Sequence, residues 1–266
     1  MSSSLLISIA TFVYGFSALA FHCGWIFQKR KFDPIANISA WVGILLNAAG
    51  FGWRWVESYE MGIGRIPLSN LYESLVFFGL SIALLYLVSQ KAFRARAVGG
   101  FALTFATLAL AYASLSPNVG SAIRPLMPAL KSNWLSIHVM TCFVGYAAFA
   151  LSFGISLLYL LSEKSQTRDM DELSHRMILL GFLFLSLGII TGAVWANSAW
   201  GRYWGWDPKE TWSLITWFIY ATLIHTRMVR GWSGKKTAIL SIIGFSAVMF
   251  TYFGVNLLPG LHSYGG

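Results

Sequence analysis

The sequence predicts an all-α integral membrane protein with about eight transmembrane helices and both termini on the outer side. Of its 266 residues, 56% are hydrophobic and 11% are charged, whereas soluble domains are about 45–50% apolar and about 25% charged. A spanning helix needs about 20 mostly apolar residues, so eight of them would use roughly 60% of the chain. Little chain is left for a soluble domain, and we expect residues 1–266 to form a single polytopic membrane domain.

Apolar runs separated by charged clusters mark the expected helices in chain order. Each run is long enough to cross a bilayer. The first run has no basic segment before it and no small-residue cleavage site, so we interpret it as a span and not as a signal peptide. The expected spans are residues 5–27, 36–56, 71–89, 97–115, 134–161, 177–196, 210–229 and 237–257.

The basic residues favour one orientation of these spans. Most Lys and Arg residues fall on one side of the expected topology, in segments 28–35, 90–96, 162–176 and 227–236. Positive residues remain cytoplasmic, so segments 57–70, 116–133 and 197–209 and the C-terminal tail are expected to face outward. The net charge of +9 is spread over short clusters and does not form one stripe, so we expect a lipid bilayer as a partner and no nucleic acid.

Tryptophan is concentrated in one outer segment, because half of the 12 tryptophans lie between residues 195 and 217. An interfacial aromatic belt explains two or three of them. It does not explain why Trp200, Trp204 and Trp206 cluster in a connection that also contains two glycines. Trp rings offer large apolar faces with a polar N–H edge. This clustering of tryptophans therefore favours a platform for a flat aromatic ligand.

The same segment contains a helix start and three charged candidates for ligand binding. Asp207, followed by proline and then by Glu210 three positions on, predicts an N-cap with a capping box. Arg202 and Lys209 have two possible partners, the carboxylates of a ligand or lipid phosphates. Asp207, Arg202 and Lys209 are accordingly candidate ligand-binding residues in addition to the cap.

Histidines occupy two depths of the expected topology. His138 lies near the outer end of its span and His262 lies in the outer tail, on either flank of the tryptophan segment. This placement suggests two axial ligands for a haem iron. His225 lies deep in its span near the inner end, where an ionisable residue is a functional candidate by default. His22 has a similar depth, so a pair with His225 is geometrically possible.

Two other polar residues, Glu73 and Arg54, each allow two interpretations. Asn70 followed by Glu73 predicts a second N-cap, although Glu73 is also a candidate functional acid at the membrane edge. Arg54 either extends to lipid phosphate or holds an anionic group of a ligand. The two cysteines, Cys23 and Cys142, lie inside apolar runs and form no metal motif, so we expect them to pack as small apolar residues.

With these motifs in place, the chain resembles the CcsA family, also called ResC, of system II cytochrome c biogenesis. The segment at 200–217 is typical of the wider WWD superfamily of haem-handling proteins, and the tail and the first matching segment narrow the resemblance to CcsA. The matching segments are LSNLYES at 68–74, SIHV around His138, WGRYWGWDPKETWSLITW at 200–217, HTR at 225–227 with RGW at 230–232, and GVNLLPGLHSYG at 254–265.

The resemblance implies eight transmembrane helices, haem b as cargo, and a membrane partner of the CcsB or ResB type. By motif match, His138 and His262 would be the axial ligands at an outer haem site. His225 would ligate iron at an inner site, with its second ligand supplied by CcsB, and His22 matches no family motif. The implied activity is attachment of haem to apocytochrome c as part of a two-protein synthase. The implied location is a bacterial cytoplasmic membrane, or alternatively a thylakoid, with the tryptophan segment facing outward.

Three other functions remain open from the sequence. One is a haem-carrying electron-transfer subunit, which would need histidine pairs on facing helices within the bilayer. Another is a haem exporter or chaperone without ligation activity. A third is a structural membrane subunit that binds no haem.

Overall fold

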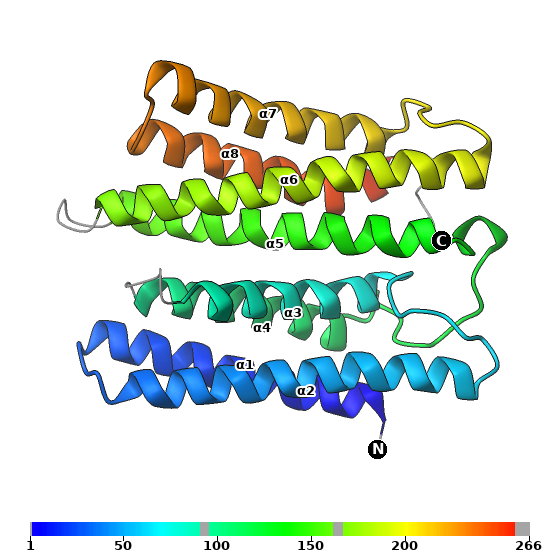
Figure 1. Cartoon of the computed structure of the whole chain (residues 1–266). Coiled ribbons are helices and arrows are strands. Elements are labelled where there is room, and N and C mark those ends of the chain that lie inside the picture. Colours follow the sequence, from blue (N-terminus) through cyan, green and yellow to red (C-terminus); the bar gives the residue numbers. More distant parts are fainter. Residues whose placement is uncertain (1, 91–95, 162–166, 259–266) are drawn as a thin grey trace. The chain divides into compact units, whose positions relative to one another are not determined.

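The computed structural model describes residues 2–90, 96–161 and 167–258. Throughout these ranges the regular structure is helical, with eight long α-helices and two short 3₁₀-helices and no strand. The predicted all-α class is therefore confirmed. The chain divides into two compact units, residues 1–130 and residues 131–266, and each contains four of the long helices, which Figure 1 labels.

Unit 1 (residues 1–130) is built from the first four helices. In this unit α1 packs against α2 and α4, and α3 packs against α4 and α2. A side chain at Gly43 would place its Cβ 2.5 Å from the ring of Tyr14, so glycine is what allows this close approach of two helices. The helices are α1 (Ser3–Ile26), α2 (Phe32–Glu60), α3 (Leu71–Ser89) and α4 (Arg96–Leu115).

Unit 2 (residues 131–266) is built from the other four helices. Its α5 packs along α6 and α8, while α7 packs against α8 and α6. Two helix starts and two helix ends meet at each end of the unit, which we call the His138 end and the His225 end after a histidine on each. The helices are α5 (Asn133–Leu161), α6 (Thr167–Trp200), α7 (Pro208–Arg230) and α8 (Lys235–Tyr252).

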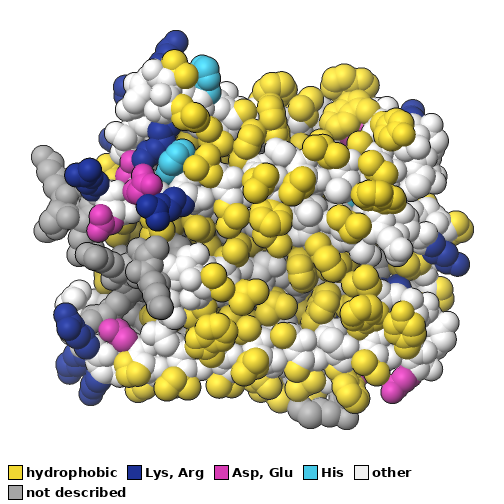
Figure 2. Space-filling view, in the orientation of Figure 1, with side chains coloured by type: hydrophobic (Ala, Val, Ile, Leu, Met, Phe, Trp, Pro, Cys, Tyr) yellow, Lys and Arg dark blue, Asp and Glu magenta, His cyan; other side chains and the backbone are white. Residues whose placement is uncertain are grey.

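Six of the helices, α1 to α6, are long and apolar enough to cross a membrane. Helix α7 has charged residues in both its first and last turns, and α8 begins with two lysines, which lowers the mean hydropathy of both helices. Figure 2 shows apolar side chains along the helix walls, with most charged side chains near the helix ends. The chain is thus an integral membrane protein by length and composition of its helices.

The largest departure from the expected boundaries concerns α6. It begins at Thr167, within a charged segment expected to be a loop, and it continues to Trp200. Charge lowers hydropathy but does not oppose helix formation. Asp169 in the first turn suits the helix dipole, and Glu172 pairs with Arg176 one turn later at 3.2 Å, as expected for an i,i+4 pair. Conversely, α8 ends at Tyr252, before the expected 257, and a 3₁₀-helix follows over Gly254–Leu257.

Candidate functional site

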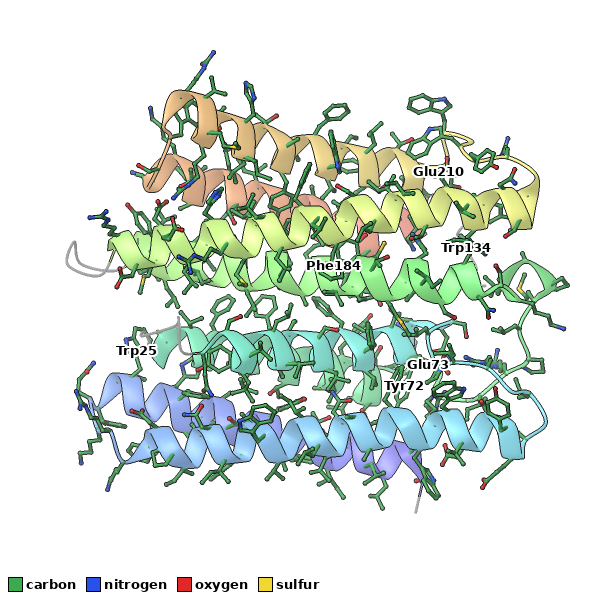
Figure 3. All side chains as sticks on the ribbon, viewed as in Figure 1. Trp25, Tyr72, Glu73, Trp134, Phe184 and Glu210 are labelled. Atoms are coloured by element: carbon green, nitrogen blue, oxygen red, sulfur yellow. The ribbon has the colours of Figure 1, made fainter. Side chains whose placement is uncertain are left out.

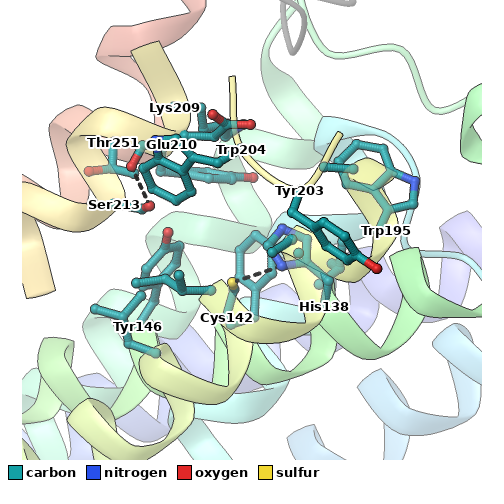
Figure 4. Close-up of a pocket in the computed structure, with 18 residues that line it drawn as sticks. His138, Cys142, Tyr146, Trp195, Tyr203, Trp204, Lys209, Glu210, Ser213 and Thr251 are labelled. Atoms are coloured by element: carbon teal, nitrogen blue, oxygen red, sulfur yellow. Dashed lines mark hydrogen bonds between the residues drawn. The ribbon is translucent and has the colours of Figure 1, made fainter. Parts of the chain in front are cut away.

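A pocket of about 130 Å³ opens at the His138 end of unit 2 (Figure 4). Its walls come from α5, α6, the start of α7 and the end of α8, together with two residues of the α6–α7 connection. Most of the lining is apolar or aromatic, and one histidine, one lysine and one glutamate (Glu210) contribute to it. We call it the His138 pocket. The lining residues used below are His138, Trp195, Tyr203, Trp204, Lys209 and Tyr252.

A hydrogen bond determines which ring nitrogen of His138 carries the proton. Nδ1 lies 2.7 Å from the carbonyl oxygen of Gly188 on α6. A carbonyl oxygen only accepts, so Nδ1 must carry the hydrogen and donate it. In the neutral ring, Nε2 then carries the lone pair, which is the tautomer that binds a metal through Nε2.

Two further contacts hold the imidazole ring in place. The ring of Trp195 lies nearly parallel to it, with centroids 6.0 Å apart and planes inclined by 15°. Trp195 is itself only 2% exposed. A Cβ at Gly192, which is also on α6, would lie 2.7 Å from ring atoms Cε1 and Nδ1. The ring is therefore oriented by packing as well as by its hydrogen bond.

The tryptophans of the predicted platform do not share one plane. Trp200 is the last residue of α6, and its ring meets Trp195 edge-on at a centroid distance of 4.8 Å. The rings of Trp204 and Trp206 are perpendicular, 5.8 Å apart and inclined by 88°. Of these three predicted residues, Trp204 lines the His138 pocket, while Trp206 is 70% exposed.

Trp206 has a backbone conformation that bulky residues rarely adopt, with φ of 57°. Such a conformation costs about 1–3 kcal/mol and persists only where its surroundings enforce it. The carboxylate of Glu210 supplies that enforcement. Its Oε2 accepts hydrogen bonds from the backbone N–H groups on both sides of Trp206, from Gly205 at 2.7 Å and from Asp207 at 3.2 Å.

The charged residues of the segment have separate placements. Asp207 caps α7, accepting a hydrogen bond from Lys209 N at 2.9 Å, and the predicted capping box is confirmed. Lys209 lines the pocket. Arg202 is exposed, and its guanidinium packs so closely over Gly205 that a Cβ there would lie 2.7 Å from Nε. Lys209 is thus the cation of this segment that faces the His138 pocket.

At the other end of unit 2, His225 is exposed on α7 near the end of that helix. Two residues later, Arg227 donates to Oδ2 of Asp171 on α6 at 2.8 Å. Oδ1 of the same carboxylate accepts from Gly234 N and from the Thr237 hydroxyl, at 2.8 and 2.9 Å. Asp171 therefore ties together three helices beside His225.

Two other histidines require separate comment. Nδ1 of His175 is buried and has no hydrogen-bond partner in the described part of the chain, although the residue as a whole is only partly buried. The outer candidate His262 lies outside the described residues. For both His138 and His225, the assignment as iron ligands remains a prediction.

In unit 1, His22 lies between α1 and α4. Its Nε2 is 3.1 Å from the Thr104 hydroxyl oxygen. That hydroxyl gives its own hydrogen to the Gly100 carbonyl at 2.7 Å, so it accepts from His22. His22 and His225 belong to different units, and their predicted pairing remains untested.

Neither interpretation of Arg54 survives in the structure, because its side chain is buried and binds Glu73. Arg54 Nε donates to Glu73 Oε1 at 3.0 Å, and Arg65 joins the same carboxylate. The N-cap expected at Asn70 is confirmed, since its side chain accepts from Glu73 N at 2.8 Å. Sequence reasoning missed the ion cluster because Arg65 and Glu73 are separated by a loop whose path only the fold determines.

The comparisons with known proteins agree with this arrangement. Residues 68–262 match the family described as Cytochrome C assembly protein. The "Cytochrome c biogenesis protein CcsA" of Chlamydomonas reinhardtii is 44% identical over 227 residues, which cover 80% of this chain and 63% of that protein. The chain therefore spans less than two thirds of that relative. The protein of the same name from Trieres chinensis is 37% identical over 301 residues and covers 95% of both chains.

A solved structure has a similar fold. The "Cytochrome c Heme Lyase CcmF" aligns with a TM-score of 0.75 over 97% of this chain and 50% of that one. At 17% sequence identity, this likeness concerns the fold alone. Because the family match covers most of the chain and the CcsA relatives are similar along nearly its whole length, the chain belongs to the cytochrome c assembly protein family and resembles its CcsA members.

Proposed function

We propose that the chain acts in cytochrome c maturation by holding haem and positioning it for attachment to the CxxCH thiols of apocytochrome c. Membership of the assembly family and relatives named as cytochrome c biogenesis proteins support this role. The observation that carries it is the hydrogen bond from His138 Nδ1 to the Gly188 carbonyl. This bond leaves the lone pair on Nε2 in an aromatic pocket, as an axial haem ligand requires.

The residue types that line the His138 pocket, aromatic side chains with a histidine and a lysine, suit haem binding. At about 130 Å³, the enclosed volume is smaller than the roughly 300–1,000 Å³ of sites that bury a ligand. The macrocycle would therefore extend through the open side, where Tyr203 and Trp206 are 60% and 70% exposed. Lys209 would pair with a propionate.

The second outer ligand in this proposal is His262. Its segment follows α8, and Tyr252 at the end of α8 lines the His138 pocket. His262 is ten residues after Tyr252, and a fully extended chain of that length spans at most about 36 Å, less here because Gly254–Leu257 form a 3₁₀-helix. This length supports His262 as a ligand on the opposite face of the macrocycle.

In the attachment step, the reacting groups belong to haem and to the apocytochrome. Each cysteine S–H adds across a vinyl C=C bond, so that sulfur bonds to one carbon and the hydrogen goes to the other. No electron is gained or lost in this addition. The chain contributes ligation and positioning, through His138 Nε2, the aromatic side chains and Lys209. The histidine of the CxxCH segment would then replace one axial ligand and aid release.

The inner site of the proposal uses His225. An exposed histidine on a largely apolar helix is costly in a membrane, and coordination to haem with a second histidine from a CcsB-type partner would account for it. Haem would enter at the His225 end and leave from the His138 end. The tryptophan segment would then face outward from a bacterial cytoplasmic membrane or a thylakoid.

The test is to purify the chain together with its CcsB-type partner and to measure haem content and covalent haem on co-expressed apocytochrome c. We expect His138→Ala and His225→Ala each to lower covalent haem at least tenfold and to remove the haem bound at its own site but not the haem at the other site. His175→Ala should leave both quantities near the parental level. Unchanged haem in both variants would refute the ligand assignment. Bound haem without any covalent product in the parental protein would instead indicate an exporter, and haem redox turnover with quinol would indicate an electron-transfer subunit.

A further inference from the structure

Glycines of α6 form a row of notches that receive side chains of α5. A Cβ at Gly181 would lie 2.5 Å from the ring of Phe149, and a Cβ at Gly188 would lie 2.6 Å from Cys142 Sγ. The third notch, at Gly192, receives His138. Small residues in such a row let two membrane helices approach closely.

Two of these glycines contact His138 directly. Gly192 leaves the space in which the imidazole lies, and Gly188 supplies the carbonyl that accepts from Nδ1. Gly188 also leaves room for Cys142, whose Sγ lies 3.6 Å from the same Nδ1 atom of His138. A side chain at Gly188 would therefore displace the sulfur that lies beside this hydrogen bond.

We propose that Gly188 and Gly192 are positioning residues for the outer haem site, an inference that rests on the proposed function. They fix Nε2 as the iron-binding nitrogen and keep the Nδ1–H bonded to a backbone carbonyl. When the ring N–H that does not face the metal donates a hydrogen bond, the imidazole becomes a stronger electron donor to the metal. Stronger donation stabilises ferric over ferrous haem, so this bond lowers the reduction potential of the iron.

The first test compares Gly192→Ala with Gly181→Ala in the complex with the partner. Both variants introduce the same methyl group against an aromatic ring of α5, but only the first ring belongs to the site. We expect Gly192→Ala to reduce haem at the outer site at least fivefold, with His225→Ala as the background so that only that site is counted. Gly181→Ala is expected to retain haem in proportion to the protein recovered.

The second test uses Cys142 and does not depend on the folding of Gly192→Ala. We expect Gly188→Ala to lower the outer haem content and to shift the potential of the remaining haem upward, because its methyl group meets Cys142 Sγ. Adding Cys142→Ala removes the sulfur and should restore both quantities. A purely structural role would change the amount of haem but not its potential.

The outcomes separate this inference from the proposed function. If His138→Ala retains outer haem, the proposed function fails. If His138→Ala loses haem while Gly192→Ala and Gly188→Ala keep parental haem content and potential, the positioning role is overturned. Loss of haem in Gly188→Ala that Cys142→Ala does not restore would also contradict it.

Discussion

Arg65 binds Glu73 through both carboxylate oxygens, at 2.7 and 3.0 Å, inside unit 1. Arg54 adds a third bond to the same carboxylate at 3.0 Å. The two arginines also donate to backbone carbonyls of the segment after α4, at Ser121 and Arg124. Glu73, which is labelled in Figure 3, therefore joins α2 and α3 to two connecting segments.

We predict that Glu73→Gln strongly destabilises unit 1. The substitution leaves two buried guanidinium groups beside a neutral side chain, and breaking a buried ion pair costs about 3–5 kcal/mol. Thermal unfolding in detergent measures the effect, with the exposed Glu60→Gln as control. A melting temperature for Glu73→Gln equal to that of the control would show that the cluster contributes no stability.

We predict that Glu210→Ala releases the turn around Trp206. The variant loses the acceptor that holds both neighbouring N–H groups, together with part of the α7 cap, which costs roughly 1 kcal/mol. Limited proteolysis within residues 201–206 should become faster and haem binding at the His138 pocket weaker. Glu210→Gln retains a side-chain oxygen as acceptor and should behave closer to the parent. Cleavage of Glu210→Ala at the parental rate would rule out the carboxylate as the restraint.

We predict that Asp171→Ala loosens the His225 end of unit 2. Arg227, Gly234 N–H and the Thr237 hydroxyl would all lose their shared acceptor. The Thr237 hydroxyl can still donate to the Gly234 carbonyl at 2.8 Å, but a group left unsatisfied costs up to about 1–3 kcal/mol. Hydrogen exchange in the last turn of α7 should accelerate, and haem bound through His225 should decrease. Glu172→Gln is the control, since Glu172 is 52% exposed and lies 3.6 Å from Arg227. Matching exchange rates in both variants would contradict the role of Asp171.

We predict that Lys209→Met weakens haem binding at the His138 pocket by about tenfold or more, because a hydrogen bond to a charged group contributes roughly 1.5–3 kcal/mol. Haem titration of the His225→Ala background measures it. Arg202→Met is the matched control, because Arg202 does not line the pocket. If both substitutions weaken binding equally, the effect reflects general surface charge and not a propionate partner.

Local signals in the sequence were sufficient for the helical class and for several helix ends. The apolar runs predicted eight helices, and the caps at Asn70 and Asp207 are present as expected. Both depend on interactions within a few residues of one another. The predicted start of α6 was wrong, because hydropathy does not distinguish a charged helical turn from a charged loop.

The chemistry of the candidate site depends on contacts between residues that are far apart in the sequence. The sequence by itself determined the membrane class, the helix order and the family motifs, since these follow from composition and short spacings. Only the tertiary structure decided that Nε2 of His138 carries the lone pair, because the carbonyl of Gly188 is fifty positions away. It likewise decided that Arg54 pairs with Glu73 and that the tryptophan rings stand at angles to one another. Side-chain orientation depends on which helix faces which, and local propensity does not encode that.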